Sequence, residues 1–184
     1  MRLSDESHTH VEQFFRAHRG EAGLMLPRIR FHGGVCARWL MLWASMSAMT
    51  LGRHVFVRPS MFRRDVQGSV TLPGWLVVHE AAHVLQYAER GFVRFLLGYL
   101  RGYWRALRVG GRWDAAGRML AYMAIEEERE ARVAEEVYAA RTPAWHSRHL
   151  FNARRGVERG EHAPCKPLLP LAPCPLRPHD RGEL

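Results

Sequence analysis

Two histidines four residues apart, His79 and His83, carry the clearest chemical signal in the sequence. Side chains at this spacing lie on one face of an α-helix, so both imidazoles can bind a single tetrahedral Zn²⁺ ion. Glu80 follows the first histidine and points away from that face, which makes it a poor third ligand. It is well placed to hold a water molecule that the metal polarises. The pattern therefore indicates metal-assisted hydrolysis, with His79 and His83 as zinc ligands and Glu80 as general base.

The residues around this motif predict the helix that the chemistry requires. Apolar residues precede and follow the histidines, which is typical of a helix that runs through a protein core. Pro73 and Gly74 lie where such a helix begins, and Gly91 lies where it ends. Gln86 lies on the histidine face, so we expect it to support an imidazole by a hydrogen bond. The alternative is a core helix whose histidines are only hydrogen-bonded, because short motifs also arise by chance.

A catalytic zinc site needs a third protein ligand, which has to come from another element. The segment 122–138 supplies glutamates at helical spacing. Glu128 lies on the inward apolar stripe of this segment, and a buried carboxylate needs a partner such as a metal ion. Glu135 lies on the same stripe two turns later, whereas Glu127 and Glu130 are displaced from it. We therefore predict Glu128 as the third ligand, with a neighbouring glutamate as the alternative.

With these motifs the chain resembles the gluzincins, which are zinc metallopeptidases with H-E-x-x-H and a downstream glutamate. It is more similar to small bacterial zincin-like domains that read H-E-x-x-H-V-x-Q-Y and then E-x-E-A, here at residues 79–87 and 128–131. The resemblance covers about residues 47–138. It implies a minimal zincin-like α+β fold, mainly helical with a small edge sheet. It also implies Zn²⁺ on His79, His83 and Glu128, with a peptide or protein as substrate.

Two finer expectations follow from the resemblance. Gluzincins often carry an aspartate four residues after the ligand glutamate to orient the first histidine, and Arg132 occupies that position here. In zincins an edge strand beside the active site can bind an extended peptide, which makes 53–58 the expected substrate-binding edge. An ordinary hairpin strand is the alternative. The oxyanion donor is left open among four residues: Tyr122, Tyr138, His146 and His149.

Periodicity and turn residues predict the remaining elements. We expect helices at 9–19, 35–49, 75–90 and 92–107, with one long or two shorter helices over 113–138. A strand is expected at 54–58, and a second strand or a loop around Val70. Prolines recur from residue 141 onward, and each removes a backbone N–H donor. The chain is therefore divided into a metallopeptidase domain, residues 1–140, and a poorly ordered tail, residues 141–184.

The segment 92–108 permits two interpretations. Its apolar residues form two adjacent helical stripes, which usually indicates burial of a wide face. Its polar residues are basic, which is also typical of an amphipathic helix on a membrane surface. This membrane contact is kept as an alternative partner.

Charge and cysteine content limit the class of protein. The net charge is +9, but six arginines in 90–112 are followed by six glutamates in 126–136, so we expect no nucleic-acid partner. Three cysteines do not form a disulfide framework, the first residues are polar, and the longest apolar run is too short to span a bilayer. A cytoplasmic protein is expected, although export by a machine that reads no N-terminal signal stays open. The rival to an enzyme is a zinc-stabilised interaction module, acting as cargo or as a toxin-associated domain.

Overall fold

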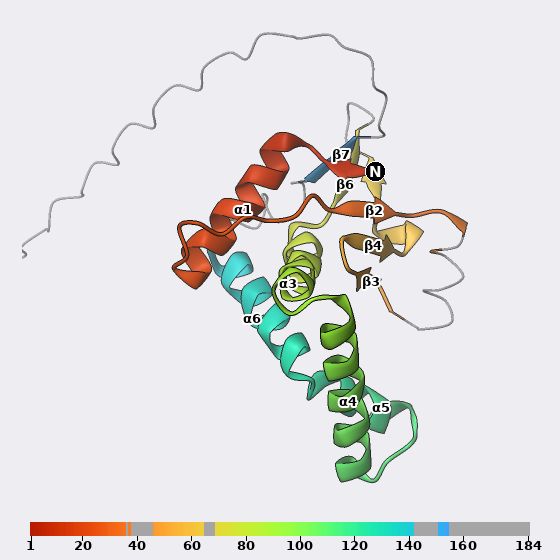
Figure 1. Cartoon of the computed structure of the whole chain (residues 1–184). Coiled ribbons are helices and arrows are strands. Elements are labelled where there is room, and N and C mark those ends of the chain that lie inside the picture. Colours follow the sequence, from red (N-terminus) through yellow and green to blue (C-terminus); the bar gives the residue numbers. More distant parts are fainter. Residues whose placement is uncertain (36, 38–45, 65–68, 142–150, 155–184) are drawn as a thin grey trace, which may run out of the picture.

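Helix α3, Gly74–Arg90, lies between a sheet and a second helix, α6, Glu126–Arg141, in the computed structural model (Figure 1). The structure describes residues 1–35, 37, 46–64, 69–141 and 151–154. Other helices with described bounds are α1 (Asp5–Arg19), α4 (Phe92–Gly110), α5 (Ala115–Met123) and the short 3-10 helix η1 (Pro59–Met61). The protein is mainly helical with a small mixed sheet, as expected from the sequence.

The sheet has seven described strands in the order β3-β4-β2-β1-β7-β6-β5. Their bounds are β1 Arg2–Leu3, β2 Arg30–His32, β3 Ala48–Leu51, β4 His54–Val57, β5 Arg63–Arg64, β6 Val70–Leu72 and β7 Phe151–Arg154. Strands β2 and β4 are parallel, and the other neighbours are antiparallel. The tight β3–β4 hairpin turns at Gly52, whose φ of 61° is a left-handed conformation that glycine adopts without steric cost.

The local sequence explains where α3 begins and ends. Pro73 precedes the first turn, and the N–H of Gly91 donates to the carbonyl of Tyr87 at the end. Twelve of the 17 residues between them are buried, because α3 contacts α6, β3 and α4. Val77 and Val78 are fully buried, and burial of each valine contributes about 1.5–3 kcal/mol to folding. The motif helix therefore has little freedom to move relative to its neighbours.

Two expectations about the elements require correction. The last residues of the helix expected at 35–49 belong to β3, because Ala48 and Met49 pair with β4; most of the rest lies outside the described residues. Strand β4 lies inside the sheet between β3 and β2, so 53–58 is not an edge. Strand β3 is the edge on this side of the described sheet. Both corrections have one cause, since Gly52 allows the chain to fold back into a hairpin.

The segment after residue 141 also contributes to the sheet. Strand β7, Phe151–Arg154, pairs with β1 on one side and with β6 on the other. Part of the expected tail thus takes a place between two strands. The prediction for the rest of 141–184 concerns residues that the structure largely does not describe.

Helices α4 and α5 form a hairpin that extends away from the sheet (Figure 1). Helix α4 ends at Gly111, whose φ of 62° is left-handed. Helix α5 begins after Asp114, whose carboxylate accepts a hydrogen bond from the N–H of Gly117. Only one of the two apolar stripes of α4 packs inward, through Phe95 and Leu107. The second stripe, expected to be buried, is exposed because α5 covers too little of α4 to reach it.

Candidate metal centre

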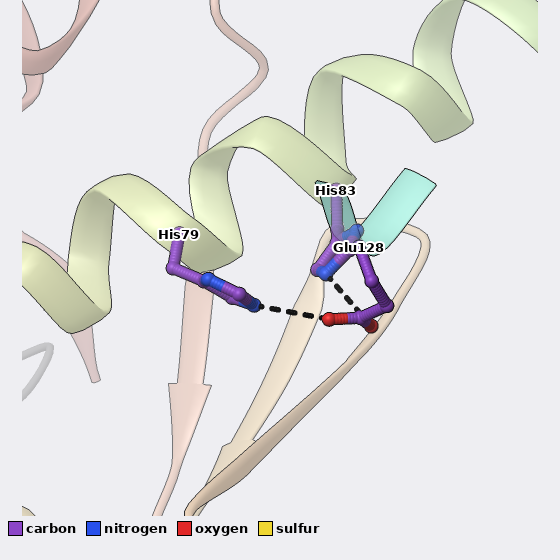
Figure 2. A group of neighbouring side chains, drawn as sticks. All are labelled: His79, His83 and Glu128. Atoms are coloured by element: carbon purple, nitrogen blue, oxygen red, sulfur yellow. Dashed lines mark ion pairs between the residues drawn. The ribbon is translucent and has the colours of Figure 1, made fainter. Parts of the chain in front are cut away.

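The side chains of His79, His83 and Glu128 converge on one point between α3 and α6. Figure 2 shows both imidazoles directed from α3 toward the carboxylate that α6 supplies. The Nε2 atom of His79 lies 3.5 Å from Oε2 of Glu128, and that of His83 lies 3.3 Å from Oε1. One potential ligand atom from each residue lies within 4.8 Å of the others. The structure therefore brings together the three residues that the sequence selected as metal ligands.

The chemistry of these donors fits a divalent metal ion. Two imidazole nitrogens and one carboxylate oxygen form a ligand set that catalytic zinc sites use, with a fourth position left for water. Glu128 is only 2% exposed, and its Oε2 atom has no hydrogen-bond partner among the described residues. A buried acceptor without a donor is costly, and a bound cation would remove that cost. The site can hold a metal ion, although these donors alone do not select one metal.

Electrostatics bind the three residues to one another even without a metal. Burial by itself lowers the pKa of His79, but contacts with Glu128 and Glu135 outweigh it and raise the pKa to about 10. The pKa of His83 is raised in the same way, since Glu128 outweighs the effect of burial. Burial raises the pKa of Glu128, but the two histidines outweigh it and hold that pKa well below its usual range. Opposite charges thus link α3 to α6 at this point.

Each histidine is oriented by a partner on its second ring nitrogen. Nδ1 of His79 lies 3.1 Å from Oε2 of Glu135, and Nδ1 of His83 lies 2.9 Å from Oε1 of Gln86. When Nδ1 carries the proton it donates to these oxygens, and Nε2 then presents its lone pair to a metal. The bond of Gln86 was expected from its position in the helix. Glu135 supplies the carboxylate that Arg132 does not, from seven residues after Glu128 instead of four.

The role of Glu135 was accessible from the sequence but was not recognised. It lies on the same helical stripe as Glu128, two turns further along α6, and α6 runs beside α3. A carboxylate on that stripe therefore faces the motif helix. Gln86 is itself fixed, because its Nε2 donates to the carbonyl of Glu127 and to the carboxylate of Glu130.

Tyrosines from the α4–α5 hairpin complete the surroundings of Glu128. The Tyr99 hydroxyl donates to Oε1 of Glu128 over 2.8 Å, a contact that sequence analysis missed because Tyr99 was assigned only to the apolar stripe. Tyr122 from α5 also acts on this carboxylate and helps to lower its pKa. Burial and the negative charge of Glu128 raise the pKa of both phenols. Both hydroxyls therefore remain protonated donors at neutral pH.

The four candidate oxyanion donors differ in their position relative to the centre. Tyr122 is the candidate that reaches the centre, through Glu128. Tyr138 instead packs against the rings of His10 and Phe14 on the α1 side of the molecule. His146 and His149 lie outside the described residues.

Glu80 occupies a separate position from the three converging residues. It is 4% exposed and accepts a hydrogen bond of 2.6 Å from the Thr50 hydroxyl of β3. Burial raises the pKa of Glu80, while the positive charges of His83 and His79 and the Thr50 hydroxyl act against that rise. Glu80 is thus a buried carboxyl group within the electrostatic influence of the histidines.

Loss of the Glu135 carboxylate is expected to weaken metal binding without removing it. In Glu135→Gln an uncharged amide replaces the carboxylate that contacts Nδ1 of His79. Loss of such a partner of a metal-binding histidine costs about 10- to 100-fold in metal affinity. Competition of the purified protein with a fluorescent zinc chelator measures this affinity. Glu136→Gln is the matched control, because Glu136 is the next residue on α6 and is exposed. Equal affinities of the two variants would exclude an orienting role for Glu135.

Residues 7–91 match the family model of the eCIS core domain, where eCIS denotes an extracellular contractile injection system. The match covers less than half of the 184 residues. It includes the helix with His79, Glu80 and His83, but ends before Glu128. No curated protein and no solved structure gives a significant match to the chain. In the described part of the chain, no helix is both long and apolar enough to cross a membrane.

Proposed function

We propose that this chain acts with an extracellular contractile injection system, as a cargo or toxin-associated protein that contains a divalent-metal centre. The observation that carries this proposal is the match of residues 7–91 to the eCIS core domain. The matched segment includes most of α1, strands β2 to β6 and helix α3, and it contributes both imidazoles. Glu128, the third residue of the centre, lies on α6 and therefore outside the matched segment.

Association with injection particles is the direct test. In cells that produce both components, we expect the full-length chain to sediment with particles purified by density-gradient centrifugation. In cells where particle assembly is blocked, we expect it to remain at the top of the gradient. A protein of similar size and charge, expressed to the same level, controls for non-specific adsorption of a chain with net charge +9. Identical gradient profiles in both cell types would contradict the proposal.

A second activity, hydrolysis of peptide bonds, is favoured by the position of Glu80. The metal we propose is Zn²⁺, held by His79, His83 and Glu128. Zinc bound to three such ligands would supply a Lewis acid that lowers the pKa of a water molecule to about 7. Glu80 is held by Thr50 beside the histidines, where a carboxylate can accept a proton from water and return it to a leaving amine. Tyr99 and Tyr122 present hydroxyl groups next to Glu128.

The sheet supports an extended peptide as the substrate. Strand β3 contains Thr50 and is the edge of the described sheet next to α3. Edge strands carry unpaired backbone groups that can pair with an added strand, which is a common way to bind a peptide. A peptide along β3 would pass the Thr50–Glu80 pair. The substrate-binding edge is therefore assigned to Ala48–Leu51 instead of 53–58.

A further inference from the structure

The outer face of the α4–α5 hairpin is apolar and exposed. On α4, four side chains at helical spacing form one stripe, and each is between 43% and 66% exposed: Val93, Leu97, Leu100 and Trp104. The ring of Trp113 continues this stripe, with its centroid 6.1 Å from that of Trp104. Met119, Leu120 and Met123 of α5 are also exposed. An apolar surface of this kind on a helix pair usually marks an interaction site.

A row of arginines runs beside the apolar stripe. Each arginine of the row is a neighbour of a stripe residue on the helix surface, so the row follows one flank of the stripe: Arg94, Arg101, Arg105 and Arg108. All four are exposed, and none has an ion-pair partner among the described residues. Helix α4 contains no acidic residue. Nearby acids are already engaged, since Asp114 pairs with Arg112 and Glu127 with Arg90.

From this arrangement we infer that the α4–α5 hairpin docks on the surface of an anionic lipid bilayer. Apolar and tryptophan side chains on one stripe suit the boundary between headgroups and acyl chains, and guanidinium groups on the flank suit lipid phosphates. A second copy of this chain is a poorer occupant, because α4 offers no carboxylate to neutralise the arginines of its partner. The hairpin extends away from the sheet, so it can meet a surface without displacing the metal centre (Figure 1).

The orientation that follows brings the proposed centre near the membrane. Tyr99 lies on the inner side of α4 and bonds Glu128, while the lipid-facing stripe lies on the outer side of the same helix. One helix thus separates the candidate metal centre from the bilayer surface. This inference does not depend on the metal or on hydrolysis, because the hairpin surface is the same in either case.

Co-sedimentation of the full chain with vesicles tests the inference. We expect binding to phosphatidylcholine vesicles that contain phosphatidylserine and little binding to phosphatidylcholine alone. A variant with Arg94, Arg101, Arg105 and Arg108 all changed to glutamine should bind roughly 600-fold more weakly, since each basic residue contributes about a fivefold factor. The matched control changes four exposed arginines elsewhere to glutamine: Arg2, Arg53, Arg63 and Arg64. Equal loss in both variants would show a net-charge effect only and overturn the docking surface.

A second measurement examines the apolar stripe by itself. Leu97→Ser combined with Leu100→Ser keeps every charge and should also weaken vesicle binding, while circular dichroism verifies that the helices persist. Light scattering of the wild-type chain detects self-association through the same face. A dimer that the Leu97 and Leu100 changes dissociate would assign the stripe to a second copy and refute the bilayer proposal. Absence of binding to the phosphatidylserine vesicles would refute it as well.

Discussion

Glu80→Gln is expected to abolish hydrolysis of an unfolded protein substrate while the zinc content stays at the wild-type level. Glutamine preserves the size of the side chain and can still contact the Thr50 hydroxyl. It cannot accept a proton at neutral pH, so the general base is lost while the residues that hold the metal are unchanged. Loss of a positioned general base costs about 100- to 10,000-fold in rate. Cleavage of casein, followed by release of new amino termini, measures the effect.

The design of this experiment separates the base from the fold. Glu89→Gln is the matched control, because Glu89 lies on the same helix and is a surface residue paired with Arg19. Zinc measured by atomic absorption in both variants shows that the metal centre persists. If Glu80→Gln and Glu89→Gln cleave casein at the wild-type rate, the hydrolase proposal is wrong. An inactive wild-type chain that binds zinc would favour the non-enzymatic module, which leaves the injection-system proposal intact.

The part of the site that could be predicted from sequence is the part determined by helical periodicity. His79, His83 and Gln86 share a face because of their spacing within one helix, and the flanking apolar residues show that this helix is buried. Glu128 was accessible for the same reason on α6. These inferences required only the geometry of single helices and the cost of burying an unpaired carboxylate.

What could not be predicted depends on how separate elements meet. Tyr99 contacts Glu128 only because the chain turns at Gly91 and packs the first turns of α4 against α3, and the spacing of Tyr99 within α4 gives no sign of that contact. Thr50 reaches Glu80 because β3 and β4 form a hairpin whose edge faces α3. The apolar run before residue 49 favoured a helix, but pairing with β4 determines the conformation of Ala48 and Met49. Backbone pairing between distant segments overrides local preference in such cases.

Removal of the metal is expected to lower the melting temperature of the chain substantially. The ligands come from α3 and α6, so a bound ion connects two helices that can separate in the unfolded state. A ligand at 1,000 times its dissociation constant stabilises the native state by about 4 kcal/mol. For a chain of this size that corresponds to a rise of roughly 8–16 °C. Thermal unfolding followed by circular dichroism, with excess zinc and after chelation, measures the difference.

Variants of the ligands distinguish stabilisation by the metal from stabilisation by packing. Glu128→Gln keeps the shape of the side chain and its bond from Tyr99 but removes the carboxylate, so its melting temperature should no longer respond to zinc. His83→Ala should show the same insensitivity together with a lower melting temperature in the metal-free form, because it also leaves a cavity beside Phe95. His10→Ala, an exposed histidine on α1, should respond to zinc like the wild type. A zinc response that survives in Glu128→Gln would place the metal elsewhere and remove the basis for the centre between α3 and α6.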